Sequence, residues 1–132
     1  MGGELARDAR GYESQFATNH LGQCQLTLAL LPASRAAGGA RVVNLSSGGH
    51  QLSDIRWEEP YSITGYDSML AYGQSKTANV LFAVELDRRW ADDEFRGYAV
   101  HPGVAFGTNL APWLTDDQPR SRRGRRRLPE GQ

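Results

Sequence analysis

Apolar residues recur at helical spacing in two parts of the chain. Between residues 12 and 31 they alternate in steps of four and three, which predicts a helix with a buried face formed by Ala17, Leu21, Cys24, Leu28 and Leu31. Pro32, followed by two glycines at 38–39, is expected to end this helix. A second helix is predicted from about Tyr72 to Trp90, with a buried face formed by Ala78, Leu81, Phe82 and Leu86.

Two short segments have the composition of β-strands. Residues 41–45 (RVVNL) are rich in β-branched residues and end at the polar stretch SSGG, and residues 97–100 (GYAV) run directly into HPG. A strand, a helix and a second strand in this order predict a parallel pair with a right-handed crossover. Because parallel sheets normally lie buried between layers of helices, two strands predict only a piece of a larger α/β domain.

The charges are unevenly distributed along the chain. The 132 residues have no net charge, but residues 119–132 contain six Arg and one Glu, so the remainder is acidic. From residue 116 onward the sequence has no hydrophobic periodicity and few apolar residues, and a disordered basic tail is expected over 116–132. The folded domain is expected to occupy residues 1–115.

The composition indicates a soluble cytoplasmic protein. The only cysteine, Cys24, excludes an internal disulfide, fits a reducing compartment, and lies on the apolar helical face, where a buried structural thiol is expected. The first twenty residues lack the apolar core of a signal peptide, and the longest apolar run, LTLALLPA, is too short to cross a bilayer. A membrane is therefore not expected as a partner.

The only lysine, Lys76, lies in the stretch AYGQSKTANVLF, four residues after Tyr72. Residues four apart share one face of a helix, so a compact ammonium is expected beside a phenol. A neighbouring cation favours the ionised form of a phenol, which makes the pair a candidate general acid and base. The alternative is a Tyr–Lys pair on the helix surface without any chemistry.

Four stretches, in order, carry motifs of one enzyme family. GYESQFATNHLGQCQLT resembles a helix with an active-site Asn, and RVVNLSSGGH resembles a strand that ends at an active-site Ser. DIRWEEP and GYDSMLAYGQSKTAN resemble an inserted loop and a helix with Tyr-x-x-x-Lys, and YAVHPGV resembles a strand followed by Pro-Gly. Together they resemble the short-chain dehydrogenase/reductase family, in its retinol-dehydrogenase-like and WW-domain-oxidoreductase-like branch. The resemblance covers about Gly11 to Leu114 and implies a partial Rossmann-type doubly wound parallel sheet, with residues 1–115 as the C-terminal catalytic half.

The resemblance implies an NAD(P)-dependent oxidoreductase that interconverts a small-molecule alcohol and a carbonyl, with NAD or NADP as cofactor. It implies that Tyr72 exchanges a proton with the substrate oxygen while hydride passes to or from the nicotinamide. Lys76 would bind the nicotinamide ribose hydroxyls and favour the phenolate of Tyr72. Ser47, rather than Ser46, would place the substrate oxygen, and Asn19 would hold a water that links the lysine to solvent.

The resemblance also implies cofactor contacts beyond Tyr72 and Lys76, since Pro102, Gly103 and Thr108 would border the nicotinamide half. HPGVAFGTNL has one residue more between Pro-Gly and Thr than the family pattern, so the role of Thr108 stays open. The Gly-x-x-x-Gly-x-Gly turn that binds the pyrophosphate is absent, and an internal fragment is therefore expected. A catalytically inactive fragment, or a module that forms a homodimer through helices 12–31 and 72–90, is the alternative.

Other chemistries find less support in the sequence. A serine hydrolase is not expected without a Gly-x-Ser-x-Gly motif, and no metal site is expected because the spacing is wrong for His20, His50, His101 and Cys24. The acidic stretch 92–94 is interpreted as a solvated helix end. The basic tail could contact nucleic-acid phosphates, but a disordered terminus explains it without that function, and nucleic acid is not expected as a partner.

Overall fold

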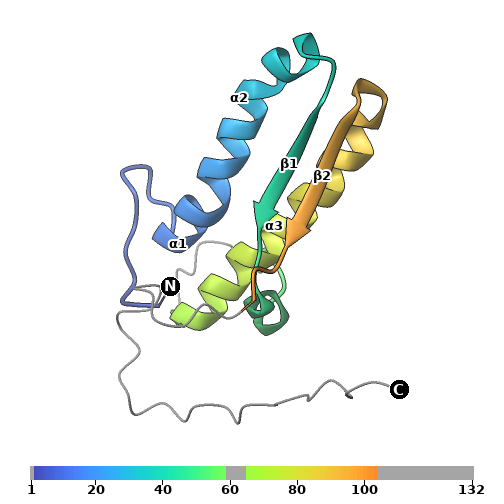
Figure 1. Ribbon diagram of the computed structural model, residues 1–132. Coiled ribbons are helices and arrows are strands. Elements are labelled where there is room, and N and C mark those ends of the chain that lie inside the picture. The colour runs from blue at the N-terminus through green and yellow to red at the C-terminus, as the bar shows by residue number, and fades with distance from the viewer. Residues whose placement is uncertain (1, 59–64, 104–132) are drawn as a thin grey trace, which may run out of the picture.

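The computed structural model describes residues 2–58 and 65–103. These residues form two helical segments and a two-stranded parallel sheet, with the strands side by side and α3 behind them (Figure 1). The elements, in chain order, are α1 (Ser14–Phe16), the π-helical turn η1 (Ala17–Leu21), α2 (Gly22–Ala36), β1 (Ala40–Leu45), the 3-10 helix η2 (Gly48–Leu52), α3 (Ser68–Trp90), the 3-10 turn η3 (Ala91–Asp93) and β2 (Phe95–Val100).

The first helical segment is longer than the sequence predicts. It begins at Glu13, whose carboxylate accepts hydrogen bonds from the next turn, and it is helical without a break from residue 14 to residue 36. The predicted end at Pro32 is wrong, because proline has a helical φ and removes only one intrahelical hydrogen bond. The chain leaves the helix at the two glycines that were also predicted to end it, Gly38 and Gly39, which both have positive φ values.

The two strands pair in parallel, as the order of elements predicts. Their register runs from Ala40 opposite Phe95 to Leu45 opposite Val100. Each strand starts one or two residues before its predicted beginning. The result is a partial α/β sheet of the Rossmann type, in which α3 provides the connection between the two strands.

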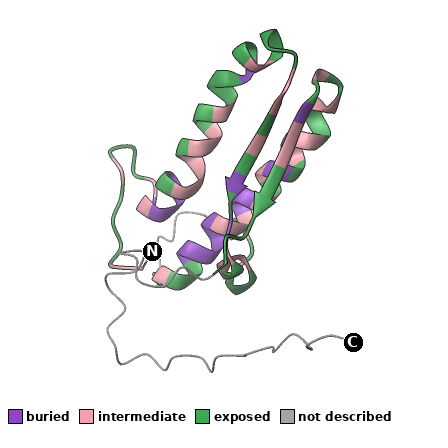
Figure 2. Cartoon of the chain, viewed as in Figure 1, coloured by how far each residue is buried: buried purple, intermediate pink, exposed green. Residues whose placement is uncertain are grey.

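The helices cover one face of this sheet. Leu31 of α2, Leu86 of α3 and Phe95 of β2 form the core, and partly buried side chains pack around them: Ala40, Val42, Phe82 and Trp90. At Gly97, α3 approaches β2 so closely that a Cβ there would lie 2.3 Å from the carbonyl oxygen of Ala83. The opposite face is uncovered among the described residues, and Figure 2 shows exposed residues along both strands.

Two of the predicted apolar positions are wrong. Leu28 of α2 and Leu81 of α3 are exposed, whereas Leu31, Ala78 and Leu86 are buried as predicted. Part of the buried face of α3 is polar instead and carries Gln74, Ser75 and Asn79. Cys24 is half-buried rather than fully buried, and this burial raises the pKa of its thiol.

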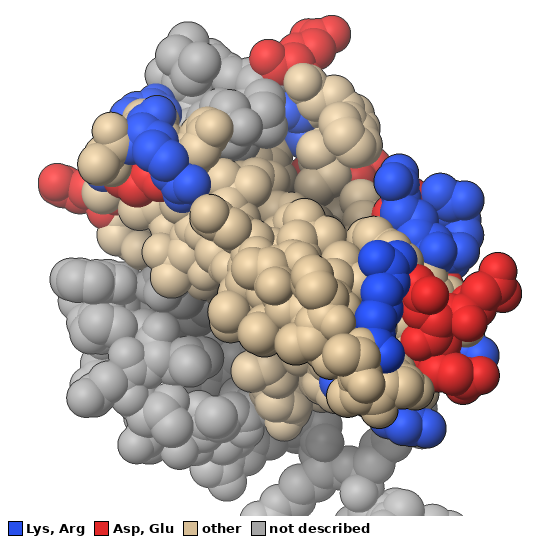
Figure 3. Space-filling view, turned by 90° about the horizontal axis from the view of Figure 1, so that it is seen from above, with Lys and Arg blue, Asp and Glu red and all other residues tan. Residues whose placement is uncertain are grey.

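Charged side chains of both signs lie side by side near the ends of α2 and α3, and Figure 3 shows such groups gathered at one side of the view. Arg35 lies 2.7 Å from Asp93, so the acidic stretch 92–94 is in part ion-paired, and hydrogen bonds from Arg88 and Arg89 lower the pKa of Glu85 to about 2. Among residues 2–58 and 65–103, no His, Cys, Asp and Glu side chains group as metal ligands would.

Two further predictions from the sequence concern the basic tail and the membrane. The expected tail over 116–132 lies outside the described residues. Within the described part of the chain, no helix combines the length and the apolar character needed to cross a bilayer.

The contact at Gly97 predicts a specific cost for added volume. We expect Gly97→Ala to lower the free energy of unfolding by about 1–3 kcal/mol, because α3 must move away from β2 to accommodate the methyl group. Gly22→Ala is the matched control: a Cβ there meets only ordinary contact, and alanine favours a helix interior by about 0.5–1 kcal/mol. Urea unfolding of the three proteins measures both effects. An equal stability of Gly97→Ala and the wild type would contradict this packing.

Candidate active site

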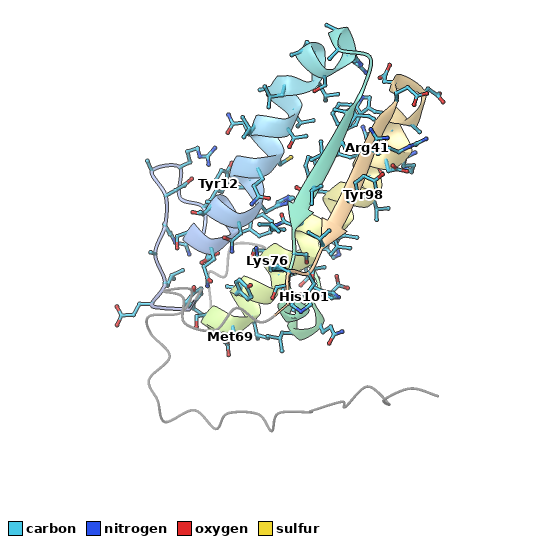
Figure 4. The ribbon with its side chains drawn as sticks, in the orientation of Figure 1. Tyr12, Arg41, Met69, Lys76, Tyr98 and His101 are labelled. Atoms are coloured by element: carbon cyan, nitrogen blue, oxygen red, sulfur yellow. The ribbon has the colours of Figure 1, made fainter. Side chains whose placement is uncertain are left out.

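Ser47, Tyr72 and Lys76 come together at the carboxyl end of β1. The ammonium of Lys76 donates a hydrogen bond to the carbonyl oxygen of Leu45, at 3.1 Å. Gly49 lies between the other two side chains, since a Cβ there would be 2.7 Å from Cε1 of Tyr72 and 3.5 Å from Oγ of Ser47. Figure 4 shows Lys76 and His101 at this end of the sheet. The absence of a side chain at Gly49 therefore allows the phenol and the hydroxyl to be neighbours.

The two serines after β1 have different environments. Ser46 is buried, and its hydroxyl donates to the backbone carbonyl of Lys76 at 3.0 Å, so it ties β1 to α3. Ser47 caps η2 by accepting a hydrogen bond from the N–H of Gly49 at 3.1 Å, which leaves its own proton without an acceptor among the described residues. Ser47 is thus the serine whose hydroxyl can donate to a ligand.

Tyr72 and Lys76 occupy successive turns near the start of α3. The helix begins at Asp67, whose carboxylate accepts hydrogen bonds from the backbone of Met69 and Leu70. Tyr72 is only 8% exposed, so its ring does not lie on the helix surface. The Lys76 ammonium lies 5.6 Å from the centre of the Tyr72 ring, and burial lowers the pKa of Lys76.

Asn19 lies in the π-helical turn η1, on the side that faces α3. Its Nδ2 donates to Oγ of Ser75 at 3.0 Å, and that hydroxyl donates in turn to the backbone carbonyl of Tyr72 at 2.7 Å. Single π-helical turns are frequent at functional sites, because they change the direction of side chains within a helix. Asn19 is therefore joined to the turn of α3 that carries Tyr72, and its expected link to Lys76 through water remains a prediction.

The predicted cofactor-side residues lie after the end of β2. Pro102 and Gly103 follow His101, the first residue after this strand, and both are exposed; Gly103 has a φ of 84° with open space where a Cβ would be. Thr108 lies outside the described residues. The structure thus brings Asn19, Ser47, Tyr72 and Lys76 into one region and leaves the contacts of Pro102 and Gly103 to a bound ligand as a prediction.

The chain has relatives among known proteins. No protein-family model matches the chain. Retinol dehydrogenase 12 of Mus musculus is 46% identical over 96 residues, which are 73% of this chain and 30% of that protein. A probable oxidoreductase of Streptomyces lividans is 43% identical over 112 residues, which are 84% of this chain and 37% of that protein. A crystal structure of an uncharacterized protein from Mycobacterium paratuberculosis aligns with a TM-score of 0.73 and 43% identity, over 85% of this chain and 41% of that one.

The chain belongs to the short-chain dehydrogenase/reductase family. The resemblance stated from its motifs is confirmed, and so is the Rossmann-type fold. The chain spans about a third of the length of the curated relatives it matches.

One further residue belongs to this candidate site and was not predicted from the sequence. Asn79 is fully buried, and its Nδ2 donates both to the carbonyl of Asn19 at 2.9 Å and to the carbonyl of Leu45 at 3.1 Å. The oxygen of the same amide lies 3.2 Å from Nδ1 of His20. Asn79 therefore joins the π-helical turn, the end of β1 and α3. Its spacing was available in the sequence, three residues after Lys76 and four after Ser75, but its carbonyl partners come from distant segments.

The orientation of this amide fixes the tautomer of His20. Because both N–H groups of Asn79 face carbonyl oxygens, its own oxygen faces the ring, and Nδ1 of His20 must carry the proton. The ring lies against Phe16 and Phe82, with centroid separations of 5.1 and 6.0 Å, and this burial lowers the pKa of His20. His20 therefore supports the site as a neutral hydrogen-bond donor.

The contacts of Asn79 predict a large loss of stability when its amide is removed. We expect Asn79→Leu to lower the free energy of unfolding by about 2–4 kcal/mol, because the carbonyl of Asn19 loses its side-chain donor, the carbonyl of Leu45 loses one of two such donors, and His20 loses its acceptor. Gln25→Ala, an amide side chain exposed on α2, should change it by less than about 0.5 kcal/mol. Denaturant unfolding, followed by circular dichroism, measures the free energy of unfolding of the two variants and of the wild type. Similar values for the two variants would contradict this role of Asn79.

Proposed function

We infer that this chain forms the catalytic part of an NAD(P)-dependent oxidoreductase that interconverts an alcohol and a carbonyl of a small molecule. The observation that carries this inference is the meeting of Ser47, Tyr72 and Lys76 at the carboxyl end of β1. Relatives named retinol dehydrogenase and probable oxidoreductase support the same reaction class.

Ser47 and Tyr72 would act on the substrate oxygen. When a carbonyl is reduced, negative charge develops on its oxygen, and a fixed donor that points at this atom stabilises the transition state. The hydroxyl of Ser47 has a proton to donate, and the hydroxyl of Tyr72 makes no hydrogen bond to another described residue. Ser47 would therefore hold the oxygen while Tyr72 gives it a proton, and in alcohol oxidation Tyr72 would take this proton back.

Lys76 fits the ribose of a nicotinamide cofactor. Its ammonium has three N–H groups, and among the described residues only the carbonyl of Leu45 accepts from one of them, so two remain for vicinal hydroxyls. The open space beside Gly103 fits the predicted border of the nicotinamide half. The cofactor, NAD or NADP, supplies or accepts the hydride when bound. Lys76 would orient the ribose beside Tyr72, since its ammonium lies 5.6 Å from the centre of the Tyr72 ring.

A dimerising role is a second candidate, because the outward faces of both helices carry exposed apolar side chains. Leu26 and Leu30 of α2 and Val84 of α3 are among them. A groove of about 290 Å³ runs beside α3 and is lined in part by Trp57 and Leu81. A homodimer through helices 12–31 and 72–90 would bury this apolar surface. Sedimentation equilibrium of the chain distinguishes a dimer from a monomer.

The acid–base assignment predicts the effect of single substitutions. The chain is fused to the segment that precedes its matched region in the Streptomyces lividans relative, and reduction of aldehydes and ketones is followed by oxidation of NADH or NADPH. We expect Tyr72→Phe to lower kcat by about 10²-fold or more while cofactor affinity stays nearly intact, because only the proton donor is lost. Lys76→Arg should impair both quantities, since a planar guanidinium cannot replace the compact ammonium.

Tyr12→Phe is the matched control for this experiment, because Tyr12 lies before α1 and apart from Lys76 (Figure 4). It should leave turnover unchanged. Full activity of Tyr72→Phe, or absence of turnover in the unsubstituted fusion, would contradict the proposed function.

A further inference from the structure

Lys76 shares its hydrogen-bond acceptor with a second side chain of α3. Residues three apart lie on one face of a helix, and Lys76 and Asn79 both donate to the carbonyl oxygen of Leu45, each at 3.1 Å. A carbonyl oxygen has two lone pairs, so two donors fill its capacity. The amide of Asn79 therefore occupies one position on this oxygen and confines the ammonium of Lys76 to the other.

The amide of Asn79 is the fixed member of this pair. It is fully buried, its second N–H is held by the carbonyl of Asn19 at 2.9 Å, and its oxygen lies 3.2 Å from Nδ1 of His20. If the amide rotated by half a turn, its oxygen would face two carbonyl oxygens and its N–H groups would face the N–H of His20, so all of these hydrogen bonds would be lost. Partners in η1 and β1 thus hold the amide in one orientation.

The ammonium of Lys76 is the adjustable member of the pair. It stands at the end of a flexible four-carbon stem, and the residue is half-buried. Within residues 2–58 and 65–103, the carbonyl of Leu45 is its only hydrogen-bond acceptor, and no carboxylate pairs with it. Without the amide of Asn79, both lone pairs of this carbonyl would be open to the ammonium. The direction of its two remaining N–H groups beside Tyr72 would then no longer be fixed.

A neighbouring amide shows that burial alone does not produce this arrangement. Asn44, one residue before Leu45 on β1, is only 3% exposed, yet its Nδ2 has no hydrogen-bond partner among the described residues. Asn44 and Asn79 are thus two buried amides of the same size, of which Asn79 alone shares an acceptor with Lys76. Asn44 therefore provides a matched control.

We propose that Asn79 is a positioning residue for Lys76. By occupying one lone pair of the Leu45 carbonyl, it holds the ammonium where its two free N–H groups can bind the vicinal ribose hydroxyls of a nicotinamide cofactor. The contact with the ribose rests on the proposed function. Asn79 touches neither substrate nor cofactor in this role and acts only through Lys76, so its loss should weaken cofactor binding more than it slows the chemical step.

Nuclear magnetic resonance tests the positioning without a cofactor, because Lys76 is the only lysine of the chain. The full chain is produced with isotope-labelled lysine, and the order parameter of the Cε methylene group is measured. In the wild type we expect a value at least about twofold higher than in the urea-unfolded chain, and Asn79→Leu should lose most of this difference. Asn44→Leu should keep the wild-type value, because the amide that it removes has no partner.

Two results of this measurement would overturn the proposal. If Lys76 were equally ordered in Asn79→Leu and in the wild type, Asn79 would stabilise the fold without holding the ammonium. If Lys76 of the folded wild type were as mobile as in the unfolded chain, there would be no fixed ammonium to explain, and this result does not depend on a variant that folds. Circular dichroism verifies that each variant compared is folded.

The consequence for the cofactor is measured in the fusion to the segment of the Streptomyces lividans relative. Asn79→Leu should raise the Kd of NADH or NADPH about tenfold, while kcat at saturating cofactor falls by less than about threefold, and Asn44→Leu should change neither. An unchanged Kd in a variant whose lysine has lost its order would contradict the assignment of Lys76 to the ribose, and with it the proposed function. The positioning of Lys76 by Asn79 would stand in that case.

Discussion

The carbonyl oxygen of Leu45 is the point on which the site depends. It is the last carbonyl of β1, and it accepts hydrogen bonds from two side chains of α3, the ammonium of Lys76 and the amide of Asn79. Because both donors belong to α3, these two bonds fix how this helix lies against the end of the strand. The same amide also holds the carbonyl of Asn19, and the π-helical turn is thereby fixed relative to Lys76. One strand end thus sets the positions of several polar groups.

The architecture could be predicted because it follows from local patterns. The composition of the segments and their order along the chain predicted the parallel strands and the second helix. The four-residue spacing of Tyr72 and Lys76 predicted that their side chains lie on one face of that helix. The end at Pro32 was wrong because a proline near the end of a helix removes a single hydrogen bond. Asn79 was missed for a different reason: its partners belong to η1 and β1, and only the tertiary structure brings these to α3.

The candidate site and the exposed apolar face of the two strands differ in how far the described residues complete them. The polar contacts among Asn19, Ser75 and Asn79 are made within the chain, so described residues alone hold the turn of α3 that carries Tyr72. The apolar surface of the strands, in contrast, has no cover among the described residues. A third of a relative's length can therefore bring Asn19, Ser47, Tyr72 and Lys76 into one region while one face of the sheet has no cover among the described residues.

The most direct measurement of the central claim is the hydrogen exchange of the Asn79 side-chain amide, followed by NMR in the isolated chain. If this amide donates to the carbonyls of Asn19 and Leu45, its two protons should exchange much more slowly than those of the exposed Gln25 amide. They should also show nuclear Overhauser contacts to the ring of His20. Exchange at the rate of Gln25, without these contacts, would contradict the account that this chain alone arranges its site.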